Sequence, residues 1–218
     1  MRPEPVSRRG GPAKAPLSRR AIVEATTELA REDGLAAVSL RRVATRLETG
    51  PASLYAYFEN REQLLAHVLD DAYARVDLVD GDRRTWRDAL AATVVNTVDA
   101  LQELPGLGSV ALGSVPVLPG ALRLADHELG LMEVGGVPAP RAALAVDLLA
   151  QFAAATAVER GDPSSTALRP VDVRSAYESA DAERFPRVVR AAAALTGPDA
   201  AARRDFALAT IIGGLTRR

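Results

Sequence analysis

The stretch from Ser39 to Arg61, SLRRVATRLETGPASLYAYFENR, constrains the fold of this 218-residue chain more than any other. Apolar residues recur there at helical spacing: Leu40, Val43, Ala44 and Leu47. Ser39 is placed to cap this short helix, Gly50 interrupts the pattern, and Pro51 suits the first position of a second helix. Two short helices joined by a tight turn are typical of a helix-turn-helix, whose second helix enters the major groove of DNA.

Helical periodicity continues on both sides of this stretch. An apolar pattern that starts at Ile22 predicts a helix that ends at Gly34, because glycine adopts the left-handed turn at little cost. Asn60 is an expected helix cap, and Gln63 completes a variant of the capping box. Residues 18–78 are therefore predicted to form four helices, the second and third of which make the helix-turn-helix.

This segment resembles the N-terminal DNA-binding domain of the TetR family of bacterial repressors. The resemblance covers roughly the first third of the chain and is most specific where Leu54-Tyr55 precedes a further aromatic and a basic residue. The matching stretches are Ile22–Gly34, Ser39–Ala44, Leu54–Phe58 and Asn60–Leu65. The rest of the chain fits the family only in helix content and length.

Two positions depart from the family pattern. Glu48 stands in the turn where the family usually has glycine, and the nearest glycine is Gly50. We therefore expect a turn that is built differently. Arg61 stands where lysine is frequent, which keeps the positive charge and a phosphate contact.

Composition agrees with a helical fold. Hydrophobic residues make up 48% of the chain and aromatic residues only 4%, so the core consists mainly of Ala, Leu and Val, and abundant alanine favours helix. We predict an all-α protein with a three-to-four-helix N-terminal helix-turn-helix domain and a larger helical ligand-binding and dimerisation domain. The expected parts are a disordered basic arm at 1–17, the DNA-binding domain at 18–79 and the second domain at 80–218. The arm either contacts DNA or is an untied terminus.

The second domain is expected to begin after a junction at Val79–Asp82. Residues 105–120 are rich in glycine and proline and allow only short helices and loops. Longer helices are predicted at about 86–104, 120–134, 140–159, 171–183 and 198–214. The helix at 61–78 is expected to belong to both domains and to connect them.

Charge and residue type suggest how DNA is contacted. Residues 1–61 carry a net charge of +4, against −5 for residues 62–218. We expect the start of the second helix to face base edges, Arg41 to contact guanine, Arg42 and Thr49 to assist at the backbone, and both tyrosines and Arg61 to bind phosphates. The candidate DNA-binding residues are Ser39, Arg41, Arg42, Thr49, Gly50, Pro51, Ala52, Ser53, Tyr55, Tyr57 and Arg61. A solvated face for Arg42 and Arg46, and packing for the tyrosines, stay open as alternatives.

The resemblance also implies a homodimer and a small-molecule effector. Alanine-rich residues 142–157 and the last helix, with Phe206 and Ile212, are apolar on more than one face. In the family, C-terminal helices of two subunits form the dimer, which reads a palindromic operator in double-stranded DNA; a purely core role for these helices is the alternative. Candidate ligand-binding residues, chosen for their chemistry alone, are Trp86, Asn96, His127, Met132, Gln151, Phe152 and Tyr177.

Other classes of protein have little support. The chain has two histidines, no cysteine and no recognisable catalytic motif, so we predict no enzyme, no metal site, no cofactor and no disulfide. No apolar run approaches the length of a membrane span and no signal peptide is apparent, so we expect a cytoplasmic protein without a membrane partner. The predicted function is a DNA-binding transcriptional regulator, a repressor released by its effector. The alternatives are an architectural DNA-binding protein, which would need a more basic surface, and a helical protein-interaction module that has lost specific DNA binding.

Overall fold

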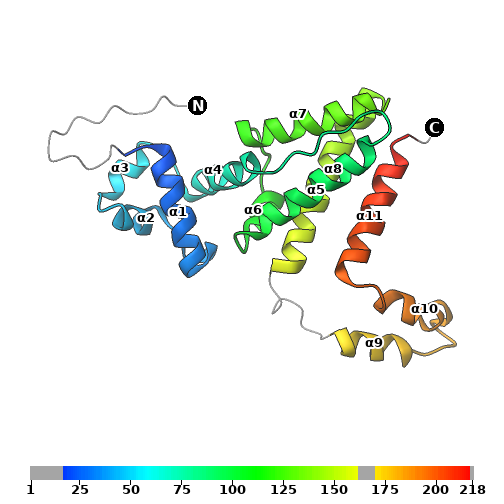
Figure 1. Cartoon of the computed structure of the whole chain (residues 1–218). Helices are drawn as coiled ribbons and strands as arrows, with labels where there is room; N and C mark the ends of the chain where they lie inside the picture. The colour runs from blue at the N-terminus through cyan, green and yellow to red at the C-terminus, as the bar shows by residue number, and fades with distance from the viewer. Residues whose placement is uncertain (1–16, 162–169, 217–218) are drawn as a thin grey trace. The chain divides into compact units, whose positions relative to one another are not determined.

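The computed structural model describes residues 17–161 and 170–216 of the chain. Within these ranges the regular structure is α-helical apart from one short 3-10 helix, and no β-strand occurs (Figure 1). The predicted all-α fold is confirmed. Two compact units, Met1–Gly161 and Asp162–Arg218, make up the chain. The predicted basic arm at 1–17 lies, except for Leu17, outside the described residues, and the predicted domain boundary near residue 79 stays a prediction.

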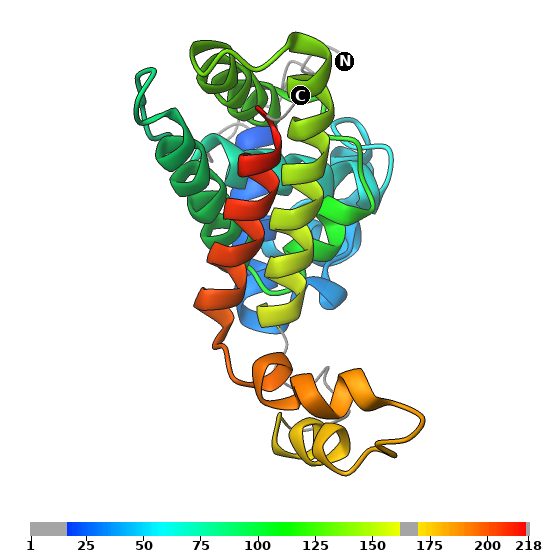
Figure 2. The same cartoon turned by 90° about the vertical axis from the view of Figure 1, so that its right-hand side faces the viewer.

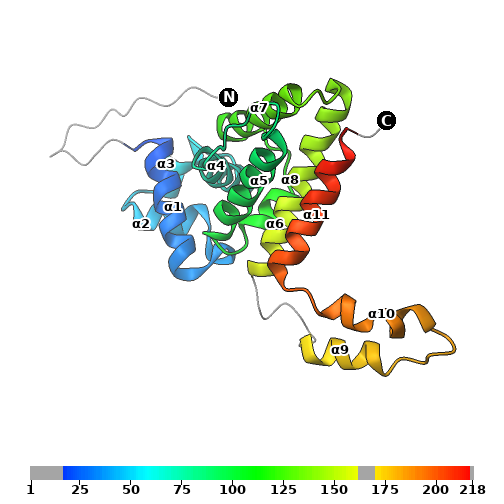
Figure 3. The same cartoon turned by 45° about the vertical axis from the view of Figure 1, so that its right-hand side comes forward.

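The first unit opens with the helices predicted for the DNA-binding segment. They are α1 (Arg19–Asp33), the 3-10 helix η1 (Leu35–Ala37), α2 (Leu40–Arg46), α3 (Pro51–Tyr55) and α4 (Arg61–Ala74). The first three α-helices gather at one end of this unit (Figure 3). The predicted stop of α1 is confirmed, because Gly34 follows it with a φ of 81°.

α4 ends four residues before the predicted end at residue 78. The N–H groups of Arg75 and Val76 bond to the carbonyls of Ala72 and Tyr73, three residues back, which tightens the last turn and ends the helix. Its N-terminus also differs in detail. The side chain of Asn60 accepts from the N–H of Gln63 at 2.7 Å, but Gln63 Oε1 accepts from the N–H of Glu59, one residue before the expected Asn60.

Four helices form the rest of the first unit: α5 (Trp86–Gln102), α6 (Leu107–Leu112), α7 (Pro119–Val134) and α8 (Ala139–Gly161). α8 packs along α5 and α6, while α7 packs on α4 and α5. Glycine permits the closest approaches. A Cβ on Gly108 would lie 2.8 Å from the carbonyl oxygen of Ala154 in α8, and one on Gly120 would lie 2.2 Å from that of Asp70 in α4.

α4 and α7 are also joined by polar contacts. Asp70 Oδ1 accepts a hydrogen bond from the backbone N–H of Ala121 in the first turn of α7, at 3.0 Å. Arg123 Nη1 donates to the carbonyl oxygens of Ala74 and Val76, both at 3.2 Å. α4, the helix that follows the helix-turn-helix, is thus bonded to α7 at two places. One is the N-terminus of α7, and the other is the C-terminal end of α4.

The second unit contains α9 (Pro170–Glu178), α10 (Pro186–Thr196) and α11 (Ala200–Gly214). α9 and α10 pack against each other (Figure 2). α9 ends at Glu178 rather than near 183, because Asp181 Oδ1 accepts from the N–H groups of Glu183 and Arg184 and forms a turn there.

α8 corrects the expectation that no apolar run approaches the length of a membrane span. By length and composition alone, Ala139–Glu159 could cross a membrane, with a mean hydropathy of 1.4 over an 18-residue window. A core helix meets the same criterion. Ala145, Leu149 and Ala153 are buried on the side of α8 that packs in the first unit, but only 33% of the window is buried, and Leu144 and Leu148 are exposed.

Candidate DNA-binding site

The two helices of the helix-turn-helix are positioned by their buried faces. The side chain of Ser39 caps α2 by accepting from the N–H of Arg42 at 3.3 Å, as the sequence predicts. Pro51 opens α3. The residues that face inward are nearly or fully buried: Leu40, Val43, Ala44, Leu54 and Phe58. Their opposite faces are therefore left for solvent or DNA.

The turn between α2 and α3 keeps a left-handed residue at the position where the family usually has glycine. Glu48 has a φ of 48° and is the one non-glycine residue with positive φ in the described ranges, whereas Gly50 is extended at −78°. The N–H of Thr49 bonds to the carbonyl of Ala44 and that of Glu48 to Thr45, the two bonds of a Schellman motif. The turn expected to be rebuilt around Gly50 is thus an ordinary helix end with a glutamate in the glycine position.

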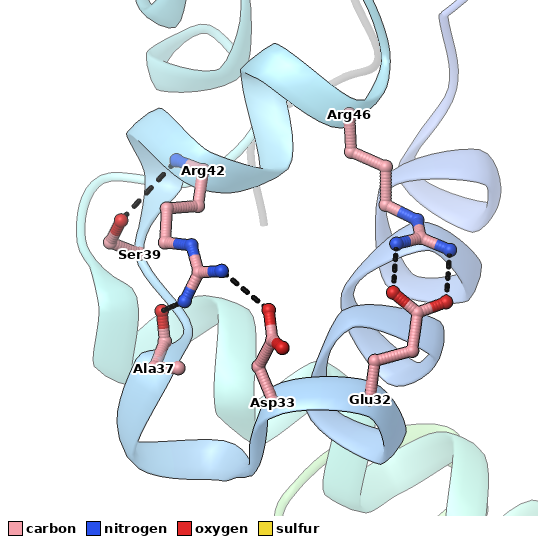
Figure 4. Close-up of polar contacts among 6 residues, drawn as sticks. All are labelled: Glu32, Asp33, Ala37, Ser39, Arg42 and Arg46. Atoms are coloured by element: carbon pink, nitrogen blue, oxygen red, sulfur yellow. Dashed lines mark hydrogen bonds and ion pairs between the residues drawn. The ribbon is translucent and has the colours of Figure 1, made fainter.

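Two arginines of α2 hold this helix against α1 (Figure 4). The Arg42 guanidinium pairs with the Asp33 carboxylate and donates to the carbonyl of Ala37 at 3.2 Å. Arg46 makes two parallel hydrogen bonds to the carboxylate of Glu32, at 2.6 and 2.8 Å. Exposed ion pairs contribute little stability individually, and these join α2 to the C-terminal part of α1. Arg42 and Arg46 are therefore already paired with acidic side chains of α1. Neither guanidinium group is fully solvated, and neither is fully available to DNA.

The exposed residues of the predicted set lie at the start of α2, in the turn and on α3. Arg41 is exposed, and its side chain makes no ion pair or hydrogen bond within the described ranges. Gly50, Pro51 and Ala52 are also exposed, and Tyr55 keeps 52% of its surface in solvent. Small side chains at the start of α3 allow its backbone to approach a groove closely.

The half-buried members of the set are Ser39, Thr49, Ser53 and Arg61. Arg61 turns inward, where Nε donates to the carbonyl of Val38 at 2.9 Å and Nη2 to that of Leu35 at 2.8 Å. Three N–H groups, two on Nη1 and one on Nη2, are left for a phosphate. In this structure Arg61 holds the start of α4 against η1.

Tyr57 is the member least suited to the predicted phosphate contact. Its side chain is only 8% exposed, and its hydroxyl donates to the carbonyl of Leu17 at 2.6 Å. The hydroxyl proton that would bind a phosphate is therefore already used within the chain. The packing role left open for the tyrosines describes Tyr57, while Tyr55 retains the exposed hydroxyl.

The seven candidate ligand-binding residues do not gather at one site. Trp86 and Met132 are core residues, 1% and 0% exposed. Asn96 donates to the carbonyl of Asp77, and His127 Nε2 lies 3.0 Å from that of Val79, so both fasten the segment before α5. Gln151, Phe152 and Tyr177 complete the set: Gln151 is exposed and donates to Asp147, Phe152 is half-buried on α8, and Tyr177 belongs to the second unit.

A cavity of about 240 Å³ lies elsewhere, between α4, α5, α7 and α8. None of the seven residues lines it. Glu128 does line the cavity, although it was not among the residues predicted from the sequence. A signal was present, since Glu128 is spaced four and seven residues from Leu124 and Ala121, on the apolar stripe of its helix.

Residues 22–68 match the family model of bacterial regulatory proteins of the tetR family, and residues 80–218 match the tetracyclin repressor-like C-terminal domain. The chain belongs to the TetR family. The resemblance inferred from the sequence is thereby confirmed, and this TetR-family protein is a transcriptional regulator rather than an enzyme.

Individual relatives agree with this assignment. The transcriptional repressor DrrR1 of Streptomyces coeruleorubidus is 34% identical over 133 residues, which are 59% of this chain and 48% of DrrR1, so the chain spans about half the length of that relative. The class C tetracycline repressor of Escherichia coli is 26% identical over 92% of this chain and 91% of its own. Crystalline apo ActR of Streptomyces coelicolor, 30% identical, superimposes with a TM-score of 0.85 over 93% of this chain and 96% of ActR. ActR has also been crystallised with actinorhodin.

Proposed function

We propose that this TetR-family protein is a homodimeric transcriptional repressor that leaves a palindromic operator when a small molecule binds its helical bundle. The observation that carries the proposal is the exposed surface of α2 and α3, where Arg41, Tyr55 and the small residues at the start of α3 are all exposed. Residues 1–61 carry a net charge of +4, of which +3 belongs to residues 1–16 and +1 to residues 17–61; positive charge at this end of the chain favours contact with DNA phosphates. We place the protein in the cytoplasm, where its operator lies, and assign DNA binding to residues 18–79 and the remaining functions to 80–218.

Dimerisation is proposed because one helix-turn-helix of this size buries little DNA surface, whereas two related by a two-fold axis read half-sites about 34–36 Å apart. α8 offers exposed apolar side chains, with Leu144 at 75% and Leu148 at 47% exposure. On α11, Phe206 is 74% exposed. These are the helices whose apolar, alanine-rich faces suggested a partner surface from the sequence.

Release by an effector is proposed from the position of the cavity. Its wall includes Tyr73 of α4 and Ala121 of α7, and the N–H of Ala121 is bonded to Asp70. A ligand that shifts α7 would therefore shift α4 and, through it, the spacing of the two DNA-binding units. The shift can be no larger than the ligand's preference for one of the two states. The ActR complex with actinorhodin supports a ligand in a relative of the same fold.

DNA binding is tested by fluorescence anisotropy on the DNA that flanks the coding region and on sequences selected from a random pool. Arg41→Ala is expected to weaken the preferred site about 5- to 150-fold and to reduce discrimination against unrelated DNA. Arg187→Ala, the same charge change at an exposed residue of the second unit, is the control. Equal losses for the two variants would contradict the role of Arg41.

The two tyrosines provide a matched pair. Tyr55→Phe is expected to weaken DNA binding without changing stability, whereas Tyr57→Phe is expected to lower stability by about 1 kcal/mol through loss of its bond to Leu17. If no sequence is enriched from the random pool at low salt, the protein is instead the helical interaction module that has lost DNA binding.

A further inference from the structure

The cavity in the helical bundle combines an apolar wall with three polar side chains from three helices. Tyr73 comes from α4, Thr97 from α5 and Glu128 from α7. Most of the remaining wall is apolar: Val94, Leu124, Val146, Leu149 and several alanines. Such a wall binds the apolar body of a ligand, and the few polar groups set its orientation.

Glu128 is the unusual member of this wall. Its side chain is 5% exposed, and within the described part of the chain it has no hydrogen bond or ion pair. Burial raises the pKa of the carboxyl to about 8. A carboxyl buried without a partner destabilises the fold, so packing does not explain why it lies here. Unpaired buried acids of this kind are typical of sites that bind a ligand.

The charges near the cavity are negative. Asp147 lies at its exposed edge and accepts a hydrogen bond from Gln151. The basic side chains of α7 point elsewhere, since Arg123 donates to carbonyls at the end of α4 and His127 lies against Val79. Among the described residues that line the cavity there is no Lys, Arg or His. A ligand anion would meet repulsion here, whereas a cation would meet an unpaired acid.

We propose that this cavity takes a small cationic amine, whose ammonium group pairs with the carboxylate of Glu128 while a compact apolar body fills the space between α5, α7 and α8. The proposal rests on the proposed function in that it names the chemistry of the effector. Tyr73 lines the same cavity as Glu128, and burial, with a smaller contribution from the Glu128 carboxylate, raises the pKa of its hydroxyl to about 12. It can therefore face the same ammonium group. A ligand held in this way contacts α4 and α7 together.

Three probes of nearly the same shape test the charge preference in the unmodified full-length protein. They are 2-naphthylmethylamine, which is cationic at pH 7, 2-naphthalenemethanol, which is neutral, and 2-naphthoate, which is anionic. Isothermal titration calorimetry is expected to show the amine binding about 10- to 100-fold more tightly than the alcohol, and the naphthoate binding least. An alcohol or naphthoate that binds as tightly as the amine, or no amine binding at millimolar concentration, would overturn the proposal.

Glu128→Gln keeps the shape and removes the charge, so the preference for the amine over the alcohol is expected to fall to within about twofold. Glu133→Gln, the same change at an exposed residue of α7 outside the cavity, is the control and is expected to leave the preference intact. An unchanged preference in folded Glu128→Gln would overturn the proposal. Titration in two buffers of different ionisation enthalpy adds a readout. At pH 7 the amine is expected to release up to about one proton as Glu128 ionises, and the alcohol none.

Separate measurements distinguish this proposal from the proposed function. DNA binding is measured without any probe. Operator binding together with no amine preference refutes the cationic effector and leaves the repressor intact. An amine preference that needs Glu128, with no DNA binding by any sequence, refutes the repressor and leaves the cation site. Loss of operator binding on addition of the amine to wild type, but not to Glu128→Gln, supports both.

Discussion

The buried Glu128 carboxyl predicts that the protein becomes less stable as the pH rises from about 5 to 8. In the unfolded chain this carboxyl has its ordinary pKa of 4.5, and in the folded protein burial raises the pKa to about 8. Between these values the folded state holds a proton that the unfolded state has lost. The stabilisation is complete below pH 4.5 and is lost as the pH approaches 8.

The magnitude follows from the gap between the two pKa values. At about 1.4 kcal/mol per pKa unit, a rise from 4.5 to about 8 corresponds to about 5 kcal/mol between the two ends of the range. Water that enters the cavity beside the charge lowers this figure, so a loss of about 2 to 5 kcal/mol is expected. That is a large share of the stability of an ordinary domain.

Urea unfolding of wild type and Glu128→Gln, at one protein concentration and at pH 5, 6.5 and 8, measures this loss. Other titrating groups cancel in the difference between the two proteins, so the difference reports Glu128. The glutamine variant is expected to gain stability relative to wild type as the pH rises, by about 2 to 5 kcal/mol. Glu133→Gln, the same change at an exposed residue of α7 outside the cavity, is the control. A flat difference for Glu128→Gln would refute the reasoning and show that the carboxyl ionises near its ordinary pKa.

Three further predictions concern the backbone and its caps. Glu48→Gly is expected to be more stable than Glu48→Ala by about 1 kcal/mol in urea unfolding, because only glycine avoids the left-handed strain at a φ of 48°; equal stability would argue against strain there. Gly135→Ala is expected to lower thermal stability by about 1 to 3 kcal/mol, since its Cβ would lie 2.3 Å from the Trp86 ring. Gly130→Ala, with no atom within 4 Å of its Cβ, is expected to raise stability by up to about 1 kcal/mol, and a loss for both variants would point to a general intolerance of α7. Asp70→Ala is expected to cost about 1 kcal/mol by uncapping α7, and an unchanged melting temperature would show that water replaces the carboxylate.

The helix-turn-helix could be predicted from the sequence because its determinants are local. Ser39, Pro51 and Asn60 mark helix starts by their own chemistry, and the apolar spacing marks the buried faces. The structure confirms these helix starts, while α4 ends four residues before its predicted end. The hydrogen-bond partners of individual side chains were harder to predict, since Tyr57 bonds to a residue 40 positions earlier and Arg61 to carbonyls more than 20 positions earlier.

The cavity could not be predicted, because its wall is assembled from four helices that only tertiary packing brings together. Chemistry alone favoured Trp86 and Met132, which the packing uses as core. Glu128 lies on an apolar stripe of its helix. From the sequence, a single charged residue in such a stripe is equally consistent with a binding site and with an irregularity of the pattern. Distinguishing the two requires the neighbours of Glu128, which the sequence does not reveal.

The seam between α4 and α7 has a mechanical consequence. Gly120 sits so close to the backbone of Asp70 and Ala74 that any side chain carried into its place would collide with α4. A sliding motion of α7 along α4 would bring Pro119 or Ala121 into that place, so the seam resists shear. The two helices therefore form one rigid unit, which would carry a displacement of α7 to the DNA-binding helices that precede α4.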